Sequence, residues 1–105
     1  PKVYNTPEIR LETKDEIKFQ IVDNVLQKLQ NDGVPVLTID GVFAEFDDVS
    51  WAALRASNTA AQLTLRFEAS SLERLKEIIG KFIGLLQQED NLELAPLEKV
   101  LKTLG

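Results

Sequence analysis

Four polar side chains stand nearly side by side in the segment RASNT: Arg55, Ser57, Asn58 and Thr59. Arginine presents a planar fork of donors that fits two oxygens of one phosphate or carboxylate group. Ser57 and Thr59 add hydroxyl donors, and Asn58 adds an amide that donates as well. These residue types, placed together, predict a site that surrounds one phosphate group with little net positive charge.

The backbone of this segment is compatible with two different structures. Asn adopts left-handed backbone angles more readily than most residues, so Asn58 favours a turn of alternating handedness. Such a turn points successive N–H groups into one concavity, a nest that binds anions. In the alternative, Arg55 is a solvated strand residue paired with Glu45, and SNT is an ordinary hairpin turn. Ordinary turns are the more common of the two, and residue types alone leave both open.

The composition excludes several other kinds of site. The chain of 105 residues has no Cys and no His, which removes disulfides, the usual zinc sites and thiol or imidazole catalysis. Its formal net charge of −5 disfavours nucleic acid and anionic membranes as partners, because both require clustered Lys and Arg. No apolar run approaches the roughly 18 residues that cross a bilayer, and the start shows no signal-peptide pattern. We therefore expect a cytoplasmic globular domain with one modest core.

The polar segment must be positioned by the elements around it, and apolar periodicity predicts these. Glu8–Thr13 alternates apolar and charged residues, as a half-buried strand does. From residue 15 to about residue 30 the apolar residues follow a helical period instead. Gly33 is suited to end that helix. Asp40-Gly41 then separates two β-branched or aromatic stretches, which is a strong hairpin signal.

A second pair of strands brackets the polar segment directly. Trp51–Ala56 and Gln62–Ala69 both alternate, and the alternation puts Arg55 on the more polar face of the first strand. Ser70 opens a capping-box pattern with a Glu three residues further on. This pattern predicts a helix that continues to about residue 88.

Taken in chain order, the predicted elements are β-α-β-β-β-β-α. The two helices would bury their apolar stripes on one face of a mainly antiparallel sheet, which gives an α+β domain of two layers. Gly80 and Gly84 are expected to ease the packing of the second helix against the sheet. Residues 89–105 are Leu-rich, and Pro96 suits the first turn of a short additional helix. Residues 1–7 have two prolines and no period, so we expect them to be extended and weakly packed.

Several segments resemble one enzyme family. RASNT followed closely by LRFEA, preceded by TIDGV and a Trp, with NTPEI near the start, resembles the C-terminal domain of the phosphomannomutase/phosphoglucomutase (α-D-phosphohexomutase) enzymes. The resemblance covers roughly residues 5–86. It implies a TBP-like α+β domain over residues 8–88, a linker from preceding domains in residues 1–7, and a C-terminal extension in residues 89–105.

The resemblance also implies a role for the polar segment. In this family the loop holds the phosphate of the hexose phosphate that is not transferred during intramolecular phosphoryl transfer, and Arg55, Ser57, Asn58 and Thr59 occupy the matching positions here. The family's catalytic phosphoserine and magnesium-binding loop belong to earlier domains and match no segment of this sequence. We expect no catalytic and no metal-binding residue in these 105 residues, and no mutase activity from them alone. Magnesium, the hexose phosphate and the preceding domains are expected as components of the parent enzyme.

The loop departs from the family pattern at Ala60 and Ala61, where a polar residue and a Pro usually follow the Thr. Loss of the Pro loosens the loop by about 0.4–1 kcal/mol of unfolded-state entropy. Arg66 either adds positive potential near the loop or, as is more common, pairs with Glu68 on its own face. The rival hypothesis is a stand-alone α+β interaction or regulatory module in which the loop is purely structural.

Overall fold

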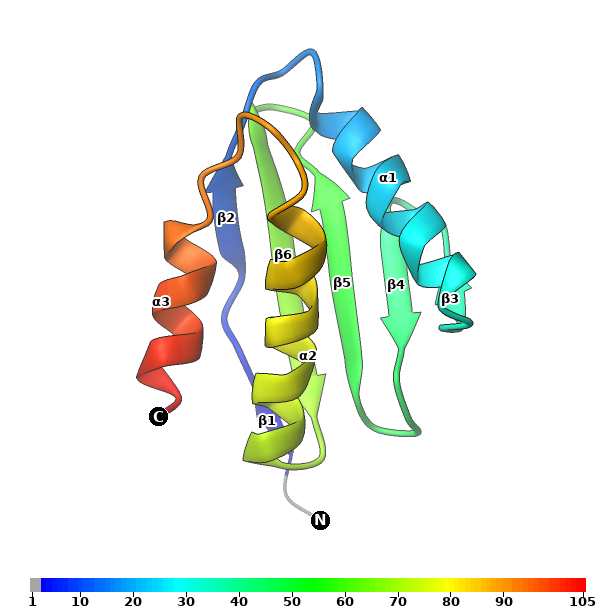
Figure 1. The fold of residues 1–105 in the computed structure, drawn as a ribbon, viewed down its shortest axis with the longest axis vertical. Coiled ribbons are helices and arrows are strands. Elements are labelled where there is room, and N and C mark those ends of the chain that lie inside the picture. The colour runs from blue at the N-terminus through cyan, green and yellow to red at the C-terminus, as the bar shows by residue number, and fades with distance from the viewer. Residues whose placement is uncertain (1–2) are drawn as a thin grey trace.

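Apolar strand residues and the apolar stripes of the helices meet on one face of an antiparallel sheet (Figure 1). The computed structural model describes residues 3–105. This is the α+β arrangement expected from the sequence, including the short third helix near the end, with one additional short strand near the start. In chain order the elements are β1 (Tyr4–Asn5), β2 (Ile9–Glu12), α1 (Lys18–Asn31), β3 (Val36–Leu37), β4 (Val42–Glu45), β5 (Trp51–Ala56), β6 (Gln62–Ala69), α2 (Leu72–Leu86) and α3 (Ala95–Thr103).

The long strand β6 joins the two parts of the sheet. The strands run in the order β1-β6-β5-β4-β3, and β2 also pairs with β6. β1 and β2 follow each other along one edge of β6, with Tyr4 opposite Ala69 at the end of that strand. On its other edge β6 pairs with β5, so that Arg55 lies opposite Thr64. The hairpin that carries the polar loop is therefore held directly against the N-terminal strands.

The core lies between the sheet and the helices. Phe67 from β6 and Phe82 from α2 are fully buried and meet edge to face, with ring centroids 5.5 Å apart. Leu97 from α3 is also fully buried, and α3 contacts both α2 and β2. Each side chain of this size contributes about 1.5–3 kcal/mol on burial, so these contacts fix the helices on the sheet.

α2 begins one residue later than the capping pattern predicted. Its N-cap is Ser71 rather than Ser70, because the Ser71 hydroxyl accepts a hydrogen bond from the backbone N–H of Arg74 at 3.0 Å. The N–H of Ser70 donates instead to the hydroxyl oxygen of Ser50 at 3.1 Å, which keeps Ser70 with the sheet. A tertiary hydrogen bond has thus moved the helix boundary.

The N-terminal segment is partly built into the sheet. Residues 1–2 lie outside the described part of the chain. Tyr4 and Asn5 form β1, and Thr6 is buried. The Thr6 N–H donates to the Phe67 carbonyl at 3.0 Å, and the Thr6 hydroxyl accepts from the Phe67 N–H at 3.2 Å. The expectation of weak packing is therefore wrong here, whereas the role of residues 1–7 as a linker stays a prediction.

The other face of the sheet carries no helix of the described chain (Figure 1). Phe43 and Trp51 stack on it with ring centroids 5.2 Å apart and ring planes at 25°. The Trp51 side chain is half-buried, so it covers the sheet. Arg55 and Arg66 lie on the same face and are exposed. This open face is where the polar side chains at the end of β5 are displayed.

The turn between β4 and β5 is tied to α2 by charged groups. The Asp47 carboxylate accepts from the backbone N–H groups of Val49 and Ser50, at 3.0 and 2.8 Å, and from the Arg74 side chain at 3.2 Å. These donors, with the Val49 N–H first, lower the pKa of Asp47 from its ordinary 3.8 to about 2. The hydrogen bonds of Arg74 to Glu77 and then to Asp47 raise the pKa of its guanidinium.

Candidate functional site

The loop between β5 and β6 turns the chain at the end of the sheet and is closed by its own hydrogen bonds. The Ser57 N–H donates to the Gln62 carbonyl at 2.9 Å and closes the base of the loop. The Thr59 N–H donates to the Ser57 hydroxyl at 3.3 Å, a local turn completed by a side chain. The Ala61 carbonyl accepts from the Thr13 N–H at 3.0 Å, which ties the loop to the segment after β2. These bonds constrain the loop although it has no Pro.

The loop does not form a nest of alternating handedness, which was one of the two structures that the sequence left open. Among residues 3–105, positive φ angles outside glycine occur only at Asp40 and Asn91. Asn58 is therefore not left-handed, and that alternative is wrong. The side-chain donors of the loop are the hydroxyls of Ser57 and Thr59 and the amide of Asn58.

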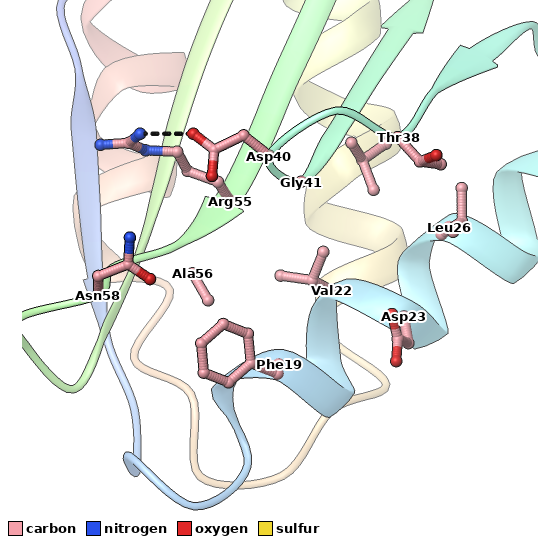
Figure 2. A pocket seen from close by; sticks show the side chains of 11 residues that line it. Phe19, Val22, Asp23, Leu26, Thr38, Asp40, Gly41, Arg55, Ala56 and Asn58 are labelled. Carbon is pink, nitrogen blue, oxygen red and sulfur yellow. Dashed lines mark hydrogen bonds and ion pairs between the residues drawn. The ribbon is translucent and has the colours of Figure 1, made fainter.

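Arg55 stands at the end of β5 on the open face, with its side chain 52% exposed. Its Nη1 lies 3.1 Å from the Asp40 carboxylate (Figure 2), and its Nε donates to the Thr64 hydroxyl at 3.4 Å. The alternative partner, Glu45, lies opposite Trp51 at the other end of the strand, so that pairing is wrong. Exposed ion pairs contribute only about 0–1 kcal/mol, so an anion can displace the carboxylate at small cost.

The Asp40-Gly41 turn sets this arrangement. The two residues have φ angles of 55° and 115°, the left-handed backbone that the hairpin signal predicted. A Cβ added to Gly41 would lie 2.5 Å from the Leu54 carbonyl oxygen and 2.8 Å from the Cβ of Arg55. Only glycine allows so close an approach of one backbone to another. The turn therefore rests directly on the residue that carries the guanidinium.

Three hollows border Arg55. One of them, of about 350 Å³, is lined by Glu8, Asp40, Thr64 and Arg66 among others, and the other two contain residues of the loop. The first of these two, of about 330 Å³, opens toward α1 and is lined by Asn58 and by apolar side chains that include Phe19 and Val22 (Figure 2). The second, of about 310 Å³, is lined by Glu8, Arg10, Arg55, Ser57, Thr59, Ala60, Gln62 and Thr64. The structure therefore brings Arg55, Ser57 and Thr59 to one polar hollow and places Asn58 at a neighbouring hollow, which Arg55 also borders.

Lys18, a residue that sequence reasoning missed, holds the loop from the start of α1. Its side chain is only 5% exposed, and its Nζ donates to the Ala60 carbonyl at 3.1 Å. The same Nζ lies 2.7 Å from the Asp15 carboxylate, so the buried charge is paired. Ala60 is one of the two positions at which the loop departs from the family pattern, in which a polar residue and then a Pro usually follow the Thr. From the sequence alone, a lysine at the start of an amphipathic helix is expected to be exposed to water. Only the fold shows that Lys18 contacts Ala60, which lies 42 positions further along the chain.

The polar side chains of Arg55 and of the β5–β6 loop are hydrogen-bond donors suited to an anion. No three acidic side chains within residues 3–105 come together in a way that could hold a metal ion. None of the helices described is long and apolar enough to cross a membrane. One guanidinium, two hydroxyls and one amide can bind and orient an anion through hydrogen bonds.

Known proteins share this sequence pattern. The family model described as "Phosphoglucomutase/phosphomannomutase, C-terminal domain" matches residues 8–85. A phosphomannomutase/phosphoglucomutase of Pseudomonas putida is 38% identical over 97 residues, which cover 90% of this chain and 20% of that protein. A phosphoglucomutase of Neisseria meningitidis serogroup B is 33% identical over 94 residues, which cover 88% of this chain and 20% of that protein. The chain thus spans about a fifth of the length of the curated relatives it matches.

A solved structure shares the fold. The crystal structure of a phosphoglucomutase/phosphomannomutase family protein from Burkholderia thailandensis matches with a TM-score of 0.69 at 31% sequence identity. The match covers 88% of this chain and 19% of that one. The similarity therefore extends through nearly all of the sheet and its helices, and involves a small part of a longer protein.

Proposed function

This chain belongs to the family of phosphoglucomutase/phosphomannomutase C-terminal domains, and on that premise we propose that its β5–β6 loop binds the phosphate of a hexose phosphate. The bound phosphate is the one that is not transferred while a phosphoryl group moves within the sugar. The proposed ligands are Arg55, Ser57, Asn58 and Thr59. One observation carries the proposal: the Arg55 guanidinium and the two loop hydroxyls border the same polar hollow at the end of β5.

The donors suit a phosphate dianion. The guanidinium can donate to two phosphate oxygens at once, and the hydroxyls can reach the others. Asp40, which competes for Arg55, is 69% exposed and can turn to water when the anion arrives. Because the loop is already closed by its own hydrogen bonds, little entropy remains to be lost on binding. Phosphoryl transfer depends on positioning and charge stabilisation, so such a clamp contributes without covalent chemistry.

The remainder of the proposal concerns the parent enzyme, because the chain spans only about a fifth of the length of its relatives. We place residues 8–88 in a cytoplasmic phosphohexomutase as its phosphate-binding domain, with residues 1–7 as the linker and residues 89–105 as an extension. The preceding domains would supply the phosphoserine, the sugar-recognition loop and the magnesium ion.

Titration of the isotope-labelled chain with inorganic phosphate, followed by backbone amide NMR, tests the role of the loop. One bidentate arginine contributes about 1.5–3 kcal/mol and each neutral donor about 1 kcal/mol, against the cost of association. We therefore expect a Kd on the order of 1 mM or weaker. The amides of Ser57, Asn58 and Thr59 should shift together, and Arg55→Ala should abolish the response, whereas Arg66→Ala should only weaken it. Shifts elsewhere, or no effect of Arg55→Ala, would favour an interaction module with a structural loop.

A further inference from the structure

Arg10 also borders the polar hollow, but it is not among the proposed phosphate ligands. It lies on β2 and borders the same hollow as Arg55, Ser57 and Thr59. In the sheet Arg10 is opposite Thr64, and Thr64 is opposite Arg55 on the next strand. Residues directly opposite each other share a face of the sheet. The three residues therefore form one row across three adjacent strands, with an arginine at each end.

The spacing of this row suits one anion held between two guanidinium groups. Neighbouring strands lie about 4.8 Å apart, so the backbones of Arg10 and Arg55 are separated by about 10 Å. Two arginine side chains can close that distance from opposite sides. Thr64, between them, is only 8% exposed although it lies on the open face. Burial of this kind is expected where long side chains flank a threonine on both neighbouring strands.

Glu8 is the charged group that faces Arg10. Its carboxylate accepts from Nε of Arg10 at 3.3 Å and from Nη2 at 3.2 Å. The side chains of Arg10 and Glu8 are 65% and 37% exposed, so water screens the pair and its net contribution is small. A phosphate dianion is a stronger acceptor than this carboxylate. Arg10 is therefore in the same situation as Arg55, which is held by Asp40 until an anion arrives.

We propose that Arg10 is a second cationic ligand of the phosphate that Arg55 binds. This inference rests on the proposed function of the loop and adds to it a residue from a different strand. When phosphate enters, both arginines exchange an exposed carboxylate for the anion, Glu8 in one case and Asp40 in the other. The site then recognises the dianion by two guanidinium groups and the loop hydroxyls, on a chain whose net charge is −5.

Phosphate titrations of charge variants of the 105-residue chain, at constant ionic strength, test the proposal. Arg10→Gln should weaken phosphate binding by about three- to tenfold. Arg66→Gln is the matched control, because it removes the same charge from the same face at a residue that borders the neighbouring hollow beside Arg55 and not this one. It should weaken binding less than Arg10→Gln does. Glu8→Gln should strengthen binding by about twofold, since it frees Arg10. That gain should vanish in the double variant that also carries Arg10→Gln.

The outcomes separate this inference from the proposed function. Equal weakening by Arg10→Gln and Arg66→Gln would show that only general charge matters and would overturn the role of Arg10. If Arg55→Ala still abolishes the response in that case, the function of the loop stands. A gain from Glu8→Gln that persists without Arg10 would also overturn the proposal. No phosphate response from the unaltered chain would overturn both. Circular dichroism of each variant verifies that it is folded.

Discussion

An added methyl group is expected to have opposite effects on stability at Gly41 and at Gly80. At Gly41, φ is +115° and a Cβ would meet the Leu54 carbonyl oxygen at 2.5 Å. Gly41→Ala should therefore cost about 1–3 kcal/mol in backbone strain and displace Arg55. At Gly80, as at Gly84, a Cβ meets nothing within 4 Å, so the close packing suggested by the sequence is absent. Gly80→Ala should add about 0.5–1 kcal/mol to the free energy of unfolding.

Denaturant unfolding of the two glycine variants measures both effects. Phosphate titration of Gly41→Ala adds a second readout, and binding should be weakened there because the turn no longer fits against Arg55. An alanine variant at Gly41 that is as stable as the parent would mean that the turn yields without strain.

Lys18 allows a test of how rigid the loop must be. Lys18→Met keeps much of the side-chain length and removes the donor to the Ala60 carbonyl. Hydrogen exchange should become faster at the Gln62 amide, since its N–H donates to the same carbonyl. Phosphate binding should weaken by about two- to fivefold. Lys14→Met removes the same charge from an exposed position and should change neither quantity. Equal exchange rates in the two variants would contradict the role of Lys18.

For single residues, the sequence predicted the loop donors but not the groups that hold them. The polar side chains of RASNT stand next to one another in the sequence, so they could be proposed as phosphate ligands without the fold, and that role stays a prediction. Asp40 and Lys18 could not be recognised, because their contacts span 15 and 42 positions and exist only in the folded sheet. Likewise, the hairpin register decides that Asp40 rather than Glu45 meets Arg55.

At the level of elements, the β4–β5 turn makes a pH-sensitive contact with α2. The pKa of Asp47 in the folded protein is about 2, below its ordinary 3.8. A carboxyl group whose pKa is lowered by folding stabilises the protein above its unfolded pKa and loses this contribution as the pH falls through the folded value. The parent should therefore be more stable than Asp47→Asn at neutral pH, with the difference fading between about pH 4 and about pH 2.

Thermal unfolding over that pH range measures the difference. Asp48→Asn is the matched control, since the structure gives this adjacent carboxylate no hydrogen bond or ion pair within residues 3–105. Its melting temperature should follow that of the parent at every pH. A constant gap between the parent and Asp47→Asn down to about pH 2 would show that the ionised carboxylate is not the cause.

Element types were predictable from apolar periodicity, whereas several element limits were not. The stripe of α2 was sufficient to predict a helix, but its N-cap depends on the hydrogen bond between Ser70 and Ser50 across the sheet. β1 has two residues, too few for any period to show, and β3, which the hairpin signal predicted, is limited to two residues. Such short strands form only because a longer neighbour already presents its hydrogen-bonding edge.

For the molecule as a whole, α3 is expected to fold together with the sheet. Leu97 is fully buried, and α3 contacts both α2 and β2. Leu97→Ala should lower the free energy of unfolding by about 2–5 kcal/mol within one cooperative transition. Leu72→Ala is the control, because Leu72 is 36% exposed and its loss should cost much less. Two transitions, or a negligible cost at Leu97, would show that α3 is an independent appendage.

β6 connects the N-terminal strand β1 to the β5–β6 loop along the length of the sheet. Its C-terminal end pairs with Tyr4–Asn5, whereas its N-terminal end leads out of the β5–β6 loop, so the two lie at opposite ends of the sheet (Figure 1). The strand has eight residues, which at about 3.3 Å each span about 26 Å. A rotation of about 5° around β1 would move the loop by about 2 Å, because displacement grows with distance from the axis. The central strand therefore converts a small rotation of the domain about β1 into a much larger displacement of the β5–β6 loop at the opposite end of the sheet.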